Sequence, residues 1–156
     1  MSSRHRPPLV LLIEDSDDDV FFFRHGLGKT GLNYQLTHLA DGAMALAHLE
    51  RALASPPDPE HPWPDLVFLD LKLPAFSGFE ILRWLRDRPH AATLDVAVLS
   101  GSEHPSDIER AMALGASDYL VKPISPAILR SRLQRWNERT HGAAPDAPPT
   151  PSGPGI

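Results

Sequence analysis

The sequence predicts an α/β fold in which five βα units form one doubly wound parallel sheet. Short apolar runs alternate along the chain with stretches of helical spacing, which is typical of βα units. Three runs, LVLLI, LVFLD and VAVLS, are almost continuously apolar, as strands covered by helices on both faces must be. The length of 156 residues indicates one domain that can bury a substantial core.

Five of these runs are predicted to be strands, and the first helix follows the first strand directly. The strand ranges are Leu9–Ile13, Tyr34–Leu39, Leu66–Asp70, Val96–Ser100 and Tyr119–Val121. The run EDSDDD, residues 14–19, comes next after the first strand. One acid of this run is expected to be the helix N-cap, and another to complement the helix dipole.

The later helices are predicted from capping residues and apolar spacing. Asp41 can cap the second helix, Pro89 ends the third, and Ser125 caps the fifth. The fourth is expected over Ser106–Leu114. The apolar positions that mark the second, third and fifth helices are Leu46, Leu49 and Leu53; Phe79, Leu82 and Leu85; and Ile128, Leu129, Leu133 and Trp136.

Composition is that of a globular protein, with 42% hydrophobic and 22% charged residues. The formal charge of −5 favours neither nucleic acid nor an anionic membrane as a partner. Cysteine is absent, which excludes disulfides and thiol catalysis. No apolar run approaches membrane-spanning length, and the polar start MSSRHRPP lacks a signal core. A cytoplasmic protein is therefore expected.

The 17 prolines are concentrated in two segments. The segment SPPDPEHPWP, within residues 55–64, is typical of a long surface loop. The proline-rich end of the chain has almost no bulky apolar side chain and cannot offset its ordering entropy. We expect a flexible start at residues 1–7, a folded domain at 8–140 and a disordered tail at 141–156.

Polar and charged residues stand at the carboxyl ends of four predicted strands. In chain order they are Glu14 and Asp15, Asp70, Ser100, and Lys122 with Pro123. Each alone has a structural explanation, such as a cap, a turn or a solvated charge. Because ligands of doubly wound sheets bind at this edge, their shared position favours a site.

The chemistry of these residues fits phosphoryl transfer. Crowded carboxylates repel one another unless a cation neutralises them, and Mg²⁺ prefers such hard oxygen ligands. A metal-bound Asp70 is then a competent nucleophile toward phosphorus and gives an acyl phosphate. The ammonium of Lys122 and the hydroxyl of Ser100 can stabilise the charge on the transferring phosphoryl oxygens.

Several segments together carry a resemblance to a known family. They are LLIEDSDDD, PDLVFLDLKLPAFSGFEIL, VLSGS, GASDYLVKP and SPAIL, in this order. The chain resembles the receiver domain of bacterial response regulators over roughly Pro8 to Arg139. This implies a flavodoxin-like receiver fold with strand order 2-1-3-4-5. It also implies a two-component phosphorelay, in which a sensor histidine kinase supplies the phosphoryl group.

The resemblance implies a role for each acidic residue of the site. Asp70 would be the phosphoacceptor. Mg²⁺ would be bound by Asp15, by Asp70 and by the backbone carbonyl of Lys72. Glu14, where many members of the family carry aspartate, would hold a water on the metal.

The remaining site residues would bind the phosphoryl group and report its arrival. Ser100, in place of the commoner threonine, and Lys122 would contact the phosphoryl oxygens. Tyr119 would be the switch aromatic, although packing in the core is an equal alternative for this side chain. The bond between Lys122 and Pro123 is expected to be cis.

Partners also follow from the resemblance. The segments EDS, DLKLP…GFE and SGS, with the proline-rich insertion, most resemble single-domain regulators paired with bacterial phytochrome histidine kinases. No helix-turn-helix or enzymatic domain follows Trp136 in this sequence, so output is expected through protein contacts rather than DNA binding. The protein would catalyse only its own phosphorylation and dephosphorylation.

A homodimer is a further hypothesis, through the face formed by the fourth helix, fifth strand and fifth helix. Its apolar residues would be Ile108, Met112, Leu129, Leu133 and Trp136. Core packing is the favoured alternative for most of them. Trp136, at the end of the last helix, is expected to be poorly buried in a single chain.

Three other functions are weighed against this one. A phosphatase of the haloacid-dehalogenase type needs a second aspartate two residues after Asp70, where this chain has Lys72. A nucleotide- or flavin-binding protein needs a glycine-rich loop after the first strand, where this chain has acids. A scaffold that works without phosphorylation stays open.

Overall fold

The computed structural model describes residues 6–54 and 58–142, which contain one five-stranded parallel sheet. The strand order β2-β1-β3-β4-β5 confirms the predicted order. The strands are β1 (Leu9–Ile13), β2 (Gln35–Leu39), β3 (Leu66–Asp70), β4 (Asp95–Ser100) and β5 (Asp118–Val121). Every strand starts and ends within one residue of its predicted range.

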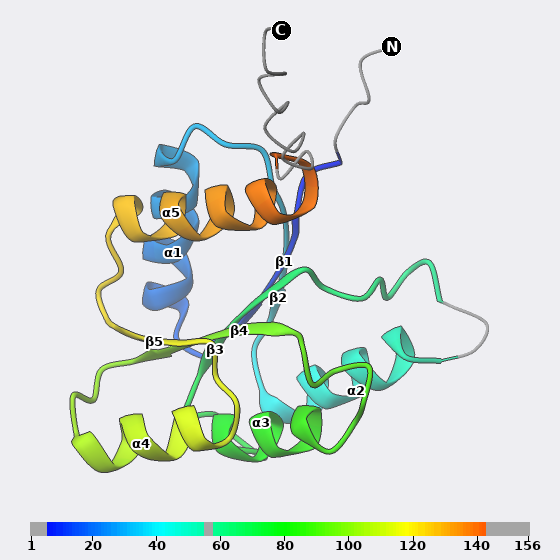
Figure 1. The fold of residues 1–156 in the computed structure, drawn as a ribbon. Helices are drawn as coiled ribbons and strands as arrows, with labels where there is room; N and C mark the ends of the chain where they lie inside the picture. Colours follow the sequence, from blue (N-terminus) through cyan, green and yellow to red (C-terminus); the bar gives the residue numbers. More distant parts are fainter. Residues whose placement is uncertain (1–5, 55–57, 143–156) are drawn as a thin grey trace, which may run out of the picture.

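Helices cover both faces of the sheet, so the fold is doubly wound. In Figure 1, α1 and α5 lie on one face, and α2, α3 and α4 lie on the other. The helices are α1 (Asp17–Lys29), α2 (Gly42–Ala52), α3 (Gly78–Arg86), α4 (Pro105–Ala113) and α5 (Pro126–Asn137), with a π-helical turn (Glu138–Gly142) after the last.

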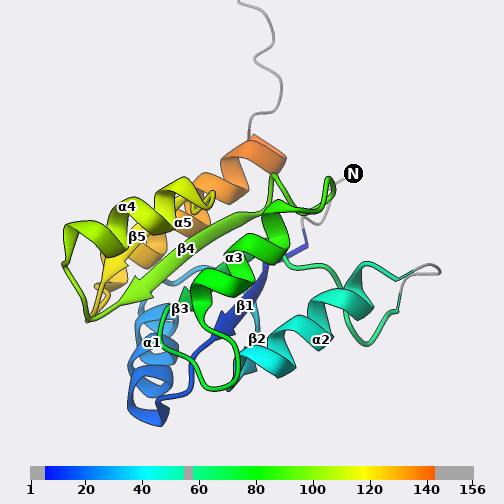
Figure 2. The same ribbon diagram turned by 90° about the horizontal axis from the view of Figure 1, so that it is seen from below.

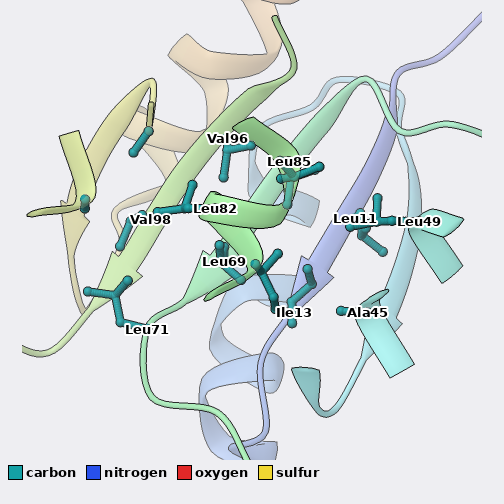
Figure 3. Close-up of a cluster of buried hydrophobic side chains, with 14 of the residues drawn as sticks. Leu11, Ile13, Ala45, Leu49, Leu69, Leu71, Leu82, Leu85, Val96 and Val98 are labelled. Atoms are coloured by element: carbon teal, nitrogen blue, oxygen red, sulfur yellow. The ribbon is translucent and has the colours of Figure 1, made fainter. Parts of the chain in front are cut away.

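Alternate residues of each central strand enter two separate hydrophobic cores. Leu11 and Ile13 of β1 pack with Leu49 of α2 in one core, which Figure 3 shows between the sheet and α2 and α3. Val10 and Leu12 enter the other core, beneath α1 and α5. Because successive side chains of a strand point to opposite faces, a strand covered on both sides must be apolar throughout.

The first helix is capped by a serine, so the expectation of an acidic N-cap is wrong. The Ser16 hydroxyl accepts a hydrogen bond from the amide of Asp19, at 3.3 Å. Glu14 and Asp15 come too early, because they complete the turn that leaves β1. Asp17, Asp18 and Asp19 fill the first helical turn, where negative charge complements the helix dipole as expected.

Residues 1–5, 55–57 and 143–156 lie outside the described residues, and the last two ranges belong to the proline-rich segments. The flexible start, the disordered tail and the domain limits therefore stay predictions. Residues 58–65 contain no helix or strand and lead into β3, in agreement with the predicted loop. No helix in the described parts of the chain is long and apolar enough to cross a membrane.

Candidate functional site

The site forms where parallel strands end at the same edge of the sheet. Asp70 is the last residue of β3 and pairs with Leu99, the residue before Ser100 in β4. Ser100 in turn pairs with Val121, the residue before Lys122. Figure 2 shows the arrowheads of β1 and β4 pointing toward this edge. The strand register therefore brings together side chains that are far apart in the sequence.

Three carboxylates form an acidic cluster at this edge. Carboxylate oxygens of Glu14, Asp15 and Asp70 all lie within 4.8 Å of one another. Glu14 and Asp70 are buried, whereas Asp15 is exposed. Burial, together with the neighbouring carboxyl of Asp70, raises the pKa of Glu14 to about 7. Full ionisation of this cluster is therefore unfavourable unless positive charge lies nearby.

Lys122 supplies the positive charge at the centre of the cluster. Its ammonium nitrogen lies 2.6 Å from Oε2 of Glu14, 2.8 Å from Oδ2 of Asp19 and 3.2 Å from Oδ2 of Asp70. Burial alone would lower the pKa of Lys122, but the hydrogen bonds to Asp19 and Glu14 raise it. The lysine is therefore charged and bridges three carboxylates.

Asp19 is a site residue that sequence reasoning did not single out. It lies in the first turn of α1 rather than at a strand end, yet its carboxylate binds Lys122. The only signal was its place in the acidic run, where it is the third of three consecutive aspartates. Nothing in that run distinguishes the aspartate that faces the sheet edge from its two neighbours.

The loop after β3 is tied closely to Asp70. The amide of Lys72 donates a hydrogen bond to Oδ1 of Asp70, at 3.1 Å. The amide of Gly78 donates to the carbonyl of Leu71, at 2.9 Å. A Cβ at position 78 would lie only 2.4 Å from the carbonyl oxygen of Asp70, so glycine allows this close approach. The loop thereby fixes the carboxylate at the sheet edge.

Ser100 and Tyr119 meet at the loop that follows β4. The hydroxyl of Ser100 is buried and accepts a hydrogen bond from the amide of Ser102, at 3.0 Å. The half-buried Tyr119 donates its hydroxyl proton to the carbonyl of Ser102, at 2.8 Å. Tyr119 also packs at the border of a hydrophobic core. The peptide bond between Lys122 and Pro123 is cis, the geometry that the resemblance implied.

The residues expected at a dimer face divide into buried and exposed ones. Leu129, Leu133 and Trp136 belong to the core beneath α1 and α5, as the core-packing alternative predicted. The expectation that Trp136 is poorly buried in a single chain is wrong, because it is only 7% exposed. Arg6 covers its ring at 5.6 Å, a contact with the start of the chain. Met112 is exposed, and Ile108 is half-buried.

The donor set at this edge fits a divalent cation such as Mg²⁺. Glu14, Asp15 and Asp70 offer hard oxygen ligands, and the carbonyl of Lys72 belongs to the loop that is hydrogen-bonded to Asp70. Asp19 adds a further carboxylate beside this cluster, because it is bound to Lys122. A bound divalent cation would favour the ionised form of Glu14, whose pKa is raised by burial and by the neighbouring Asp70.

Fold and site together define an α/β protein with a carboxylate cluster at the carboxyl edge of its sheet. Residues 10–134 match the response regulator receiver domain, and the chain belongs to this family. It is therefore a receiver domain of two-component signalling.

The chain matches curated relatives over the receiver region. It is 33% identical over 124 residues to a probable cyclic di-GMP phosphodiesterase of Vibrio cholerae, covering 80% of this chain and 25% of that protein. It spans about half the length of the next curated regulators that it matches. It is 32% identical over 123 residues to the response regulator Rcp1 of Synechocystis, covering 78% of this chain and 82% of Rcp1.

Similar solved structures include regulators associated with phytochromes. The Mn²⁺-bound form of Rcp1 is 29% identical with a TM-score of 0.66, covering 85% of this chain and 93% of that chain. The phosphorylated cyanobacterial phytochrome response regulator RcpA is 27% identical with a TM-score of 0.68, covering 85% and 93%. Rcp1 was thus crystallised with a divalent metal, and RcpA in its phosphorylated form.

Proposed function

We propose that this protein is a single-domain response regulator that accepts a phosphoryl group on Asp70 from a sensor histidine kinase. The reaction depends on Mg²⁺, and the signal passes on through protein contacts rather than through DNA binding. One observation carries the proposal. The ammonium of Lys122 lies 3.2 Å from the carboxylate of Asp70, inside a cluster of acidic side chains suited to a divalent cation.

In this function Asp70 is the nucleophile. One of its carboxylate oxygens forms the new P–O bond while the P–N bond to the kinase histidine breaks, and the imidazole leaves. Bound Mg²⁺, held by Asp15, Asp70 and the carbonyl of Lys72 and by Glu14 through a water, would neutralise charge on the phosphoryl oxygens. Lys122 pairs with the same oxygens and so orients the group.

Ser100 and Tyr119 connect the phosphoryl group to the protein surface. The Ser100 hydroxyl accepts an amide proton from Ser102 and keeps its own proton to donate to a phosphoryl oxygen. Movement of Ser100 toward the phosphoryl group would displace the loop to which Tyr119 is hydrogen-bonded. Phosphorylation can thereby shift the population of two states of the face around α4 and β5.

The partner kinase is proposed to be a bacterial phytochrome, in the cytoplasm. The similarity to RcpA and Rcp1 supports this choice, since RcpA is a phytochrome response regulator. A homodimer through the face of α4, β5 and α5 is also proposed. Its apolar contacts would come from Ile108 and Met112 rather than from Leu129, Leu133 and Trp136, which fill the core.

Intact-protein mass spectrometry after incubation with acetyl phosphate and Mg²⁺ tests the central proposal. The wild type should gain the mass of one phosphoryl group. Asp70→Asn, and wild type treated with a chelator, should gain nothing. If the wild type stays unmodified where a control receiver is phosphorylated, Asp70 is no phosphoacceptor for small donors. If Asp70→Asn is modified equally, the phosphoryl group is elsewhere.

A further inference from the structure

A second group of metal-ligating side chains lies at the opposite edge of the sheet, in the proline-rich loop before β3. Donor atoms of Asp58, Glu60 and His61 all lie within 4.8 Å of one another. The loop precedes the first residue of β3, whereas Asp70 is the last residue of that strand. This group is therefore separate from the acidic cluster around Asp70.

The loop holds His61 in one orientation and one tautomer. Nδ1 of His61 lies 2.9 Å from Oδ2 of Asp58, and the other oxygen of Asp58 accepts the amide of Glu60 at 2.9 Å. Without a metal, a neutral His61 donates its Nδ1 proton to this carboxylate. A cation that takes the place of this proton would be bound by Nδ1 of His61 and Oδ2 of Asp58 together. The amide of Glu60 and the ring of His61 lower the pKa of Asp58, so the carboxylate stays ionised.

A second histidine faces this group from α2. The ring of His48 lies 5.1 Å from the ring of His61, tilted by 59°. His48 is 8% exposed, an unusual burial for a titratable side chain in the last turns of a helix. Burial and the neighbouring His61 lower the pKa of His48.

The charges and the backbone also favour a cation here. Asp58 and Glu60 bring two acidic side chains to this group, and Arg51 of α2 is the cation whose charge acts on Asp58. Pro59 and Pro62 flank the ligand positions and fix their own backbone angles, which lowers the entropy cost of ordering the loop.

We propose that Asp58, Glu60 and His61 bind one transition-metal ion of the Zn²⁺ type. His48, whose ring lies beside that of His61 but whose nitrogens are outside this group of donors, would turn toward the ion as the fourth ligand and so fasten the proline-rich loop to α2. Two imidazoles with two carboxylates match the ligand preference of Zn²⁺, whereas Mg²⁺ takes oxygen ligands only. Neighbouring ligands of a tetrahedral zinc ion lie about 3.4 Å apart, so the 2.9 Å pair of Asp58 and His61 needs only a small opening.

Titration of the full chain with ZnCl₂, followed by calorimetry, tests this site. The double variant Asp15→Asn, Asp70→Asn serves as the background, because it disables the acidic cluster as a competing metal site. One Zn²⁺ should bind per chain, and excess Mg²⁺ should not displace it. His61→Ala should lower the affinity by at least about tenfold, and His48→Gln by a similar factor. His25→Ala, on an exposed face of α1, is the matched control and should change nothing.

A spectroscopic measurement distinguishes loss of the metal site from loss of the fold. Co²⁺ should give the intense visible absorption of a tetrahedral site, and Asp58→Asn, a loop variant with the fold intact by circular dichroism, should lose it. Absence of Zn²⁺ binding to the double variant would overturn the proposal. Binding that survives both His61→Ala and Asp58→Asn would also overturn it and would assign the ion to other histidines.

Discussion

The ammonium nitrogen of Lys122 lies 2.8 Å from Oδ2 of Asp19, closer than its 3.2 Å distance from Oδ2 of Asp70. The lysine proposed to bind the phosphoryl group is therefore engaged by a carboxylate of α1 before the group arrives. The Asp19 side chain is 38% exposed, so water screens this ion pair. Such pairs are worth about 0.2–1 kcal/mol.

Asp19→Asn should accelerate phosphorylation by acetyl phosphate, because Lys122 loses a competitor for the phosphoryl oxygens. The screened pair predicts an increase of about 1.5- to 5-fold in the rate, measured by mass spectrometry over time. Asp18→Asn removes the same charge from an exposed neighbour and is the control. Equal acceleration in both variants would show that net charge, and not the contact with Lys122, sets the rate.

The raised pKa of Glu14 predicts that stability depends on pH when no metal is bound. The folded protein holds a proton on Glu14 up to about pH 7, whereas the unfolded chain releases it near the ordinary glutamate pKa of 4.5. The folded state binds more protons in this window, so its stability falls as pH rises from about 4.5 to 7. The free energy of unfolding should drop by about 1–3 kcal/mol.

Glu14→Gln isolates this effect, because glutamine resembles the protonated side chain and does not titrate. Urea unfolding in chelator at pH 5, 6, 7 and 8 should show the wild type losing stability relative to this variant as pH rises. A difference between the two proteins that stays constant across this range would mean that Glu14 is ionised throughout. The ion pair with Lys122 would then outweigh burial.

Mg²⁺ should stabilise the wild type through the acidic cluster. An ion that binds only the folded state at 100 times its dissociation constant adds about 2.7 kcal/mol to the free energy of unfolding. Asp15→Asn should abolish most of this gain in thermal unfolding with and without chelator. Asp17→Asn, in the same acidic run but outside the cluster, should retain it. Retention of the full gain in Asp15→Asn would place the ion elsewhere.

The sequence predicts the strand-end residues well for a physical reason. A strand buried on both faces must be apolar along its whole length, so the first polar residue after it marks the sheet edge. Asp70 and Ser100 were found in this way, and parallel topology then brings them together. Asp19 is not predicted in this way, because it lies in a helix and its contact with Lys122 joins residues that are far apart in the sequence.

The burial of Trp136 and Arg132 in α5 is not predicted by the sequence, for a similar reason. Helical spacing marks the apolar side of α5, but it does not show what covers the end of that side. Trp136 is covered by Arg6, a contact between the two ends of the domain. In the same helix Arg132 is buried between Asp95 and Asp118, at 2.5 Å and 3.3 Å, although arginine usually indicates an exposed position. Such long-range partners leave no local pattern.

Gly78→Ala should damage the site and the fold together. The new Cβ would lie 2.4 Å from the carbonyl oxygen of Asp70, and backbone must move to admit it. We expect a loss of about 2–4 kcal/mol in the free energy of unfolding, and slower phosphorylation. Gly28→Ala is the matched control in α1, where a Cβ meets no atom within 4 Å, and it should stabilise by about 0.5–1 kcal/mol. Equal effects in the two variants would refute the steric argument.

If the dimer face has been assigned correctly, substitution of Trp136 should lower the stability of the fold, whereas substitution of Met112 should weaken dimerisation and leave stability unchanged. Trp136→Ala removes a buried side chain from the core and should cost about 3–5 kcal/mol of stability at any protein concentration. Met112→Glu changes a side chain that is 44% exposed, so stability should stay within about 0.5 kcal/mol.

Sedimentation velocity, with and without beryllium fluoride as a phosphoryl mimic, separates the two roles. The wild type should dimerise more strongly with the mimic, and Met112→Glu should stay monomeric because it places a charge in the apolar contact. A wild type that is monomeric under both conditions would eliminate the dimer. Dimerisation that persists in Met112→Glu would move the interface away from α4, since a buried unpaired carboxylate at the contact would not be tolerated.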